Sequence, residues 1–425
     1  MKHEMDGNEK SDCCADGHDG PALKLEDALA RILAEVKPVS GSETMALRDA
    51  LGRILDADVI SPIDVPAHTN SAMDGYALRS ADLLSDENTR LDVIGVAAAG
   101  RPFGGVVAAG QCVRILTGAP LPQGADTVVM QEQVTRDDDT VTIRAGQKHG
   151  QHVRQAGEDI AAGSVALAAG ALLMPAELGM LASVGVTEVS VRRRPRVAFF
   201  STGDELRSVG EPLETGQIYD SNRYTIHGML TRIGVEAIDM GVVRDEPADV
   251  ESAFARAAAE ADAVVTSGGV SVGDADYVQA TLEKMGSVGF WKVAMKPGRP
   301  LAFGRIGDAL FFGLPGNPVS AMVTFYQLVQ PALRAMAGMP DLGPPLTVTA
   351  VSGEALRKKP GRYEFQRGVL TRDEDGQLLV RRAGFQGSGV LSSMNAANCF
   401  IVLPEEAGPV SAGDTVTVQP FSAFV

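Results

Sequence analysis

Apolar positions follow helical spacing in some segments of the chain and form short strand-like runs in others. In residues 23–36 they recur at steps of three and four residues, which predicts an amphipathic helix that ends before Pro38. Residues 62–159 instead carry short apolar runs, such as 127–130 and 141–143, between turns rich in Gly and Pro. These runs predict a compact β-rich domain.

A second helical pattern covers residues 175–184, and a strand-like run follows at 187–191. The basic, Pro-interrupted run 192–196 comes next and predicts a domain boundary. From residue 196 to 338, apolar runs alternate with helical patterns, and this order predicts a doubly wound parallel sheet. The expected strands are residues 197–200, 235–243, 263–266 and 310–314, and the expected helices are residues 223–233, 247–261 and 318–337.

Beyond Pro340 the pattern returns to short alternating strands, which predicts a small all-β domain.

The length of 425 residues favours about two to four domains. With 45% hydrophobic and 22% charged residues, the composition excludes a disordered, collagenous or coiled-coil protein. Residues 1–20 are polar and aperiodic, so we expect a disordered tail there. The later strands are expected at residues 346–351, 378–380 and 415–418.

The sequence contains no sign of a membrane or secretory segment. No run approaches the roughly 18 apolar residues that a membrane crossing needs, and residues 1–20 include no apolar leader. The cysteines match neither a zinc-site spacing nor a disulfide framework. We therefore expect a cytoplasmic protein without a membrane partner. The four cysteines are Cys13, Cys14, Cys112 and Cys399.

The charge balance limits the classes of ligand. The chain carries 38 basic and 54 acidic residues, a net charge of −16, so nucleic acid is not an expected partner. An anionic ligand therefore needs a site at which basic residues make the local electrostatic potential positive. Only 6 His and 1 Trp occur, which favours electrostatic positioning over proton shuttling or base stacking as the chemical strategy.

Three expected strands end in loops rich in Gly, Ser, Thr or Asn, at residues 201–205, 266–271 and 315–318. In an open α/β sheet, ligands bind beyond the carboxyl ends of the strands, where Gly allows close backbone approach and hydroxyls supply donors. Taken singly, each loop is better explained as an ordinary turn that caps a helix. Three of them in one sheet favour a cradle for phosphate or another oxyanion.

Basic residues gather near the end of another expected strand. Lys292 and Lys296 lie four residues apart on the run 290–295 and at its end, a spacing that places both side chains on one face. Arg299 follows within KPGRP. Together they supply the local positive field that the chain as a whole lacks. The alternative is an edge strand whose lysines discourage aggregation.

Carboxylates recur at the same strand ends. Helix capping would account for Asp220, Asp245 and Asp276 individually. It does not account for acids and lysines at one sheet edge, which suit Mg²⁺ held by carboxylates and ligand phosphate oxygens. Because Walker, HExxH and CxxC motifs are absent from the sequence, the residues alone indicate a Mg²⁺-bound phosphate ester of unspecified chemistry. The full set is Asp204, Glu205, Asp220, Asp245, Asp274 and Asp276.

Five longer motifs occur in series: NSAMDGYA (70–77), RILTGAPLPQGAD (114–126), SGGVSVGDADY (267–277), KPGRP (296–300) and GLPGNPVSA (313–321). On these motifs the chain resembles the molybdopterin molybdenumtransferases, the MoeA and gephyrin E-domain family. The resemblance implies four domains in each subunit. They are a discontinuous elongated linking domain (21–61 and 160–194), a β-rich inserted domain (62–159), a doubly wound molybdopterin-binding α/β domain (195–338) and a C-terminal β-barrel (339–425).

The resemblance also implies a reaction. Molybdate and adenylylated molybdopterin would yield molybdenum cofactor and AMP, with Mg²⁺ assisting. The subunits would form a homodimer whose cleft lies between the α/β domain of one subunit and the inserted domain of the other. Molybdopterin adenylyltransferase and molybdenum enzymes are the protein partners that the resemblance suggests.

The family's functional positions map onto three domains of this chain. By the resemblance, Glu205 and Asp276 would hold Mg²⁺. Lys292, Lys296 and Arg367 would bind molybdate and pyrophosphate oxygens. The remaining catalytic positions are Asp74, Thr117 and Asp159, which would orient substrate or water, together with Asp245. The expected substrate-binding residues are Arg154, Thr202, Gly203, Asp220, Ser221, Asn222, Gly268, Gly269, Ser271, Pro297, Gly298, Arg299, Pro315, Asn317, Pro318, Arg367 and Ser388.

Two departures and two alternatives accompany the resemblance. The family commonly has an aromatic residue and an acid where this chain has His68 and Thr69, and a histidine where it has Gly389. The segment SGGVSVGDADY also resembles a motif of the adenylyltransferase that makes the substrate, and such an enzyme would consume ATP. A related animal domain clusters receptors, so a non-enzymatic scaffold is the other alternative.

Overall fold

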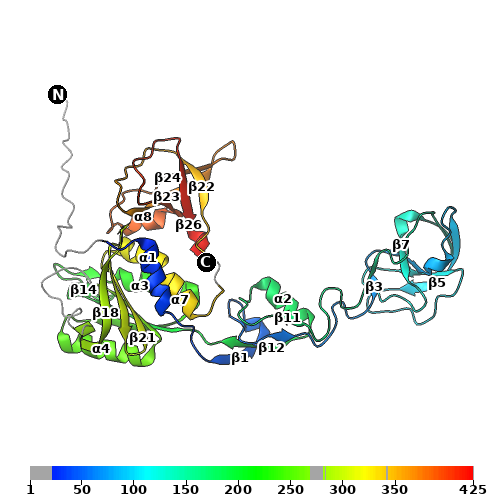
Figure 1. Cartoon of the computed structure of the whole chain (residues 1–425), viewed down its shortest axis with the longest axis horizontal. Coiled ribbons are helices and arrows are strands. Elements are labelled where there is room, and N and C mark those ends of the chain that lie inside the picture. Colours follow the sequence, from blue (N-terminus) through cyan, green and yellow to red (C-terminus); the bar gives the residue numbers. More distant parts are fainter. Residues whose placement is uncertain (1–21, 269–280, 283, 341–342, 425) are drawn as a thin grey trace. The chain divides into compact units, whose positions relative to one another are not determined.

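The computed structural model describes residues 22–268, 281–282, 284–340 and 343–424. The chain forms two compact units, and each is described by itself (Figure 1). Unit 1 comprises Met1–Ser40 and Arg193–Val425, and unit 2 is Gly41–Arg192. Unit 1 therefore combines an N-terminal segment with the C-terminal half of the chain.

A six-stranded sheet with the order β16-β13-β17-β21-β20-β18 forms the centre of the α/β part of unit 1. Strands β16, β13, β17 and β21 are parallel, whereas β20 and β18 are antiparallel. The strands are β13 (Arg196–Thr202), β16 (Glu236–Val243), β17 (Ala263–Ser267), β18 (Gly286–Lys292), β20 (Pro300–Ile306) and β21 (Ala309–Leu314).

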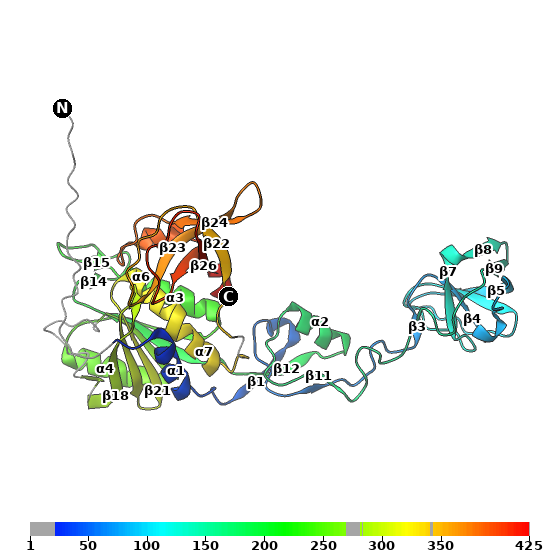
Figure 2. The same cartoon turned by 45° about the horizontal axis from the view of Figure 1, so that its top comes forward.

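Helices cover both faces of this sheet (Figures 1 and 2). One core joins the sheet to α1, α3, α6 and α7, and a second core joins the opposite face to α4. Helix α3 ends at Gly234, whose φ of 84° suits glycine. The helices are α1 (Leu25–Glu35), α3 (Ser221–Ile233), α4 (Pro247–Glu260), α6 (Pro318–Thr324) and α7 (Gln330–Met336), with a π-helical turn at Phe325–Val329 between the last two.

The structure corrects two expectations about this sheet. It is mixed rather than parallel, because β18, β20 and β21 form an antiparallel meander. The strand expected over residues 290–295 ends at Lys292, since Val293 N donates to Arg299 O (2.7 Å). Met295–Lys296 is a separate strand, β19, in another sheet, so Lys292 and Lys296 do not share one face of a strand.

The C-terminal part of unit 1 is a closed β-barrel. Its strands run β23-β24-β22-β26-β25, and β25 also pairs with β23 to close the ring. Strand β19 pairs in parallel with the start of β23 and thereby joins the α/β part to the barrel. The elements are β22 (Val348–Ser352), β23 (Tyr363–Arg372), β24 (Leu378–Arg382), α8 (Leu391–Ala396), β25 (Cys399–Leu403), β26 (Thr415–Pro420) and a 3₁₀ turn at Phe421–Phe424.

Unit 2 contains a six-stranded, mostly antiparallel sheet with the order β7-β4-β6-β5-β9-β8. A second group of elements comprises the pairs β1–β12 and β2–β11 with α2. Its strands are β1 (Ser42–Ala46), β2 (Val59–Ile60), β3 (Asn70–Ser71), β4 (Gly75–Leu78), β5 (Thr89–Ala97), β6 (Gln111–Ile115), β7 (Thr127–Met130), β8 (Val134–Asp137), β9 (Thr140–Ile143), β10 (Val153–Arg154), β11 (Val165–Leu167) and β12 (Glu188–Arg192), and helix α2 is Pro175–Ser183.

The helices and strands expected from the hydrophobic pattern are present in both units, with ends that differ by a few residues. Helix α1 ends before Pro38, as the spacing predicts. The helix expected over residues 318–337 is interrupted by the π-helical turn, and Pro331 falls at the junction with α7. Two short strands, β14 (Leu206–Arg207) and β15 (Ile218–Tyr219), lie between β13 and α3 and were not expected.

Candidate functional site

The three polar loops begin at the ends of neighbouring strands along one edge of the α/β sheet, and the second is described only as far as Gly268. Ser201 of β13 stands opposite Ser267 of β17, which stands opposite Leu314 of β21. All three strands are parallel, so their carboxyl ends lie at the same edge of the sheet. Gly268 has a φ of 94°, and a Cβ there would overlap the carbonyl oxygen of Thr202. Glycine is therefore required where the ends of β13 and β17 approach each other.

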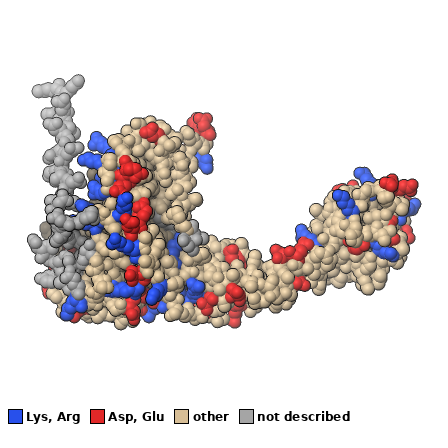
Figure 3. Space-filling model, in the orientation of Figure 1, with Lys and Arg blue, Asp and Glu red and all other residues tan. Residues whose placement is uncertain are grey.

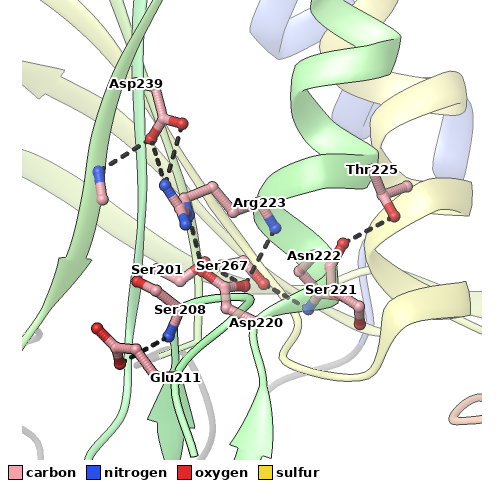
Figure 4. A network of polar contacts seen from close by, with 11 residues as sticks. Ser201, Ser208, Glu211, Asp220, Ser221, Asn222, Arg223, Thr225, Asp239 and Ser267 are labelled. Carbon is pink, nitrogen blue, oxygen red and sulfur yellow. Dashed lines mark hydrogen bonds and ion pairs between the residues drawn. The ribbon is translucent and has the colours of Figure 1, made fainter.

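Asp220 lies at the centre of the polar network drawn in Figure 4 and is 1% exposed. Its Oδ1 accepts from Ser201 Oγ (3.0 Å) and from the backbone N of Arg223 (3.1 Å). Asp220 therefore caps α3, as expected, and ties the helix to β13. Arg223 Nη1 in turn donates to both carboxylate oxygens of Asp239 on β16 (3.1 Å each). The network thus links the end of β13, the middle of β16 and the start of α3.

Asn222 extends the network to the other two loops. Its Nδ2 donates to Ser267 Oγ (2.7 Å) and to Gly316 O (2.7 Å). The buried Asn222 Oδ1, Thr202 Oγ1 and Thr266 Oγ1 have no hydrogen-bond partner among the described residues. Such atoms are costly to leave unpaired, and at this edge they suit a polar ligand.

Three carboxylates lie close together on the adjoining loops. Burial raises the pKa of Asp245 above its ordinary value, and the charges of Asp204 and Glu205 raise it further. The backbone N of Asp245 lies 3.4 Å from Asp204 Oδ1. Asp245 does not cap α4, contrary to the capping interpretation, because Glu246 is the N-cap residue. The charges of Asp204 and Glu205 disfavour the ionised form of Asp245, and a bound cation would relieve this repulsion.

Of the two residues expected to hold Mg²⁺, the structure describes Glu205 but not Asp276. Glu205 is exposed beside Gly203, where a Cβ would meet its Oε2 at 2.6 Å. Asp276, Asp274, Gly269 and Ser271 lie outside the described residues. Within the described ranges, no group of three or more His, Cys, Asp and Glu residues is assembled to hold a metal ion.

The KPGRP segment lies between the α/β part and the barrel. Lys296 is exposed, whereas Pro297 and Gly298 are buried. Gly298 has a φ of 101°, and a Cβ there would lie 2.5 Å from Thr324 Oγ1 of α6. Arg299 is half-buried, and its Nε has no hydrogen-bond partner in the part of the chain that the structure describes. Lys292 is half-buried at the end of β18.

Arg367 is almost fully buried, at 1% exposure. Burial lowers the pKa of its guanidinium to about 10. Its Nη2 donates to Gly387 O (3.1 Å) and its Nε to Ser393 Oγ (3.1 Å), but within the described part of the chain it has no ion-pair partner. A buried cation without a carboxylate suits an anion.

Ser388 lies on the loop that Arg367 holds, and this loop contacts the start of α6. Val319 N donates to Ser388 O (3.0 Å), and a Cβ at Gly389 would lie 3.6 Å from Asn317 Oδ1. The α6 segment therefore joins the expected substrate-binding residues Pro315, Asn317 and Pro318 to the barrel loop. The sequence did not predict that Arg367 would support this loop.

The candidate residues of unit 2 lie on loops of its β-rich part, except for Arg154 on the short strand β10. Asp74 Oδ1 accepts from Thr117 N and Thr117 Oγ1, both at 2.7 Å. These two hydrogen bonds, with a smaller effect of Arg114, hold the pKa of Asp74 below its ordinary value. Arg154 pairs with Asn70 between β10 and β3, and Asp159 is exposed with its N donating to Val65 O (3.0 Å).

Several supporting residues could not be read from the sequence. Asp239 and Glu364 carry no motif, although Arg223 follows Asp220 at the spacing of neighbours on one helix face. On the face drawn in Figure 3, acidic and basic side chains of unit 1 lie interspersed.

None of the helices in the described residues is long and apolar enough to cross a membrane.

Comparison with family models accounts for most of the chain. Residues 23–185 match the MoeA N-terminal region (domain I and II), residues 198–335 a "Probable molybdopterin binding domain" and residues 349–421 the MoeA C-terminal region (domain IV). The α/β domain with its polar sheet edge and the closed barrel thus define a molybdopterin-binding enzyme of the MoeA class.

Whole-chain relatives give the family. Molybdopterin molybdenumtransferase of Haemophilus influenzae is 48% identical over 94% of this chain and 99% of its own length, and that of Nostoc is 38% identical over 89% and 88%. A crystal structure of the molybdopterin biosynthesis moeA protein from Pyrococcus horikoshii OT3 matches with a TM-score of 0.81 and 29% identity, covering 94% and 100% of the two chains. The chain belongs to the molybdopterin molybdenumtransferase family, enzymes of molybdenum cofactor biosynthesis.

The hydrogen bonds at Asp74 generate a testable prediction. Thr117→Val removes the hydroxyl donor but retains the backbone donor, so the pKa of Asp74 should rise part of the way toward its ordinary value. Carboxyl NMR titration measures this change. Thr140→Val is the matched control, because Thr140 Oγ1 donates to Asp137 O instead (3.0 Å). An Asp74 pKa that is equal in the Thr117 variant and the parent protein would contradict the assignment.

Proposed function

We propose that this enzyme inserts molybdenum from molybdate into adenylylated molybdopterin with Mg²⁺ and releases AMP. The observation that carries the proposal is Arg367, a guanidinium that is 1% exposed and lies beneath the Ser388 loop without a carboxylate partner among the described residues. A buried, unpaired cation is stabilised by an anion that enters the same site. Lys296, on the neighbouring β19, adds a second and exposed cation.

The α/β sheet edge is the proposed place for the phosphates and the pterin. Asn222, Ser267 and the backbone of residues 315–318 offer donors and acceptors at the ends of three parallel strands. The network around Asp220 fixes these groups before the substrate binds. The other expected substrate-binding residues at this edge, Thr202, Gly203, Ser221, Gly268 and Arg299, lie on the same loops or the adjoining KPGRP turn.

The carboxylates of the adjoining loops supply the proposed metal position. Glu205 would hold Mg²⁺, together with Asp276 outside the described residues, and the raised pKa of Asp245 fits a cation at this place. When bound, Mg²⁺ would neutralise phosphate oxygens and polarise the pyrophosphate bond. Lys292 and Lys296 would orient the molybdate and pyrophosphate oxygens by charge-assisted hydrogen bonds.

We further propose a homodimer in which Asp74, Thr117, Arg154 and Asp159 of one subunit complete the cleft of the other. The Asp74 carboxylate remains ionised and fixed by Thr117, as required of a group that orients a substrate or water. A cytoplasmic location and contacts with molybdopterin adenylyltransferase or molybdenum enzymes belong to the same proposal.

The direct test is AMP release from adenylylated molybdopterin on addition of molybdate and Mg²⁺. Lys296→Ala should raise the molybdate KM roughly 10- to 100-fold, because a charge-assisted hydrogen bond contributes about 1.5–3 kcal/mol. Lys284→Ala is the matched control, since Lys284 is exposed and ion-paired with Glu251 (2.9 Å). If the parent enzyme releases no AMP, the proposed reaction is wrong. Consumption of ATP with free molybdopterin would favour the adenylyltransferase alternative instead.

Mixing two impaired variants, at a molybdate concentration well below the raised KM of Lys296→Ala, tests the shared cleft. Asp74→Asn and Lys296→Ala each remove one side of a cleft, so a mixed dimer has one intact cleft and one doubly altered cleft. Random reassociation should restore about one quarter of the parent activity. Mixtures without any recovery, despite mixed dimers detected by native mass spectrometry, would place both residues in the cleft of one subunit.

A further inference from the structure

Glu364 lies at the start of β23, where the barrel meets the segment that carries Lys296. It is 8% exposed and stands opposite Lys296 in the parallel pairing of β19 with β23. Its Oε1 lies 3.7 Å from Lys296 Nζ. Its Oε2 accepts from Gln366 Nε2 (3.0 Å), which also donates to Arg357 O (3.0 Å). The carboxylate is therefore fixed by the barrel and faces the lysine.

The two charged groups differ in their exposure. The side chain of Lys296 is 54% exposed, whereas that of Glu364 is only 11% exposed. The lysine therefore lies on the solvent side of the pair. A separation of 3.7 Å is an ion pair rather than a hydrogen bond, so the contact uses none of the three N–H donors of the ammonium. The carboxylate limits where the ammonium lies without occupying the donors that an anion needs.

A long lysine side chain loses considerable rotamer entropy when it is fixed by a ligand. An anchor that restricts the side chain beforehand reduces this loss on binding. We propose that Glu364 is a positioning residue, which holds the ammonium of Lys296 at the junction of β19 and β23 so that it meets the molybdenum oxyanion already oriented. This rests on the proposed function above, in which Lys296 binds molybdate.

Two other roles for Glu364 give different outcomes. As a counter-ion for the buried Lys358, whose Nζ donates to Lys359 O (2.8 Å), it would affect stability and not molybdate. As an electrostatic competitor, it would weaken anion binding, and its neutralisation would lower the molybdate KM. Only the positioning role predicts that neutralisation of Glu364 raises the molybdate KM and that this increase requires Lys296.

The test compares Glu364→Gln with Glu354→Gln in the full-length enzyme. Glu354 lies on the same barrel and is ion-paired with Arg382 (2.7 Å), so it controls for loss of a barrel carboxylate. Glu364→Gln should raise the molybdate KM roughly three- to tenfold with little change in kcat, and Glu354→Gln should leave both unchanged. Isothermal titration with molybdate should give the same ratio without turnover.

A double-mutant cycle separates positioning from a structural role. In a Lys296→Ala background, Glu364→Gln should have no further effect on molybdate affinity. Glu364→Asp, which retains the charge, should give an intermediate KM and serves as the second variant if Glu364→Gln unfolds. An unchanged or lowered molybdate KM in folded Glu364 variants overturns the inference. So does a KM increase from Glu364→Gln that is as large in the Lys296→Ala background as in the parent enzyme. Failure of the proposed function is distinct, because Lys296→Ala alone would then leave molybdate binding unchanged.

Discussion

A single buried carboxylate, Asp220, organises the edge of the α/β sheet on which the candidate site depends. It accepts from Ser201 on β13 and from the first turn of α3, while Arg223 on that turn is paired with Asp239 on β16. These donors satisfy Oδ1 of the buried carboxylate, and Oδ2 lies 3.3 Å from Arg223 Nε, whose charge offsets the cost of burial. The same turn carries Asn222, which reaches β17 and the loop before α6. The site is therefore arranged by the fold before any ligand is present.

The fold also places cations where an acidic chain can bind an anion. The chain has a net charge of −16, yet its proposed substrates are anions. Cations gather where β18, the KPGRP turn and the barrel meet, and one of them, Arg367, is buried without a carboxylate partner in the described residues. Acids lie on the loops after β13 and β16, where burial raises the pKa of Asp245 and the charges of Asp204 and Glu205 raise it further. Acidic loops and a cationic junction in one unit suit a metal-bound phosphate ester and an oxyanion as ligands.

The sequence predicts those parts of the fold that depend on local pattern. Apolar runs followed by Gly-rich loops placed β13, β17 and β21 correctly, and their parallel order brings the loops together. The antiparallel β18–β20 pair was missed because pairing within a meander has no helical signal between its strands. The break after Lys292 depends on a backbone hydrogen bond with Arg299, which residue spacing cannot reveal. Asp74 and Thr117 are 43 positions apart, so only the family motifs could suggest their contact.

The central claim is that the cations at the junction of the α/β domain and the barrel bind the molybdenum oxyanion. Anomalous diffraction at the molybdenum K edge, from crystals soaked in molybdate with AMP and Mg²⁺, tests it most directly. The account predicts an anomalous peak in contact with the Lys296 ammonium and the Ser388 loop. A fully occupied peak elsewhere, with that junction empty, would contradict it.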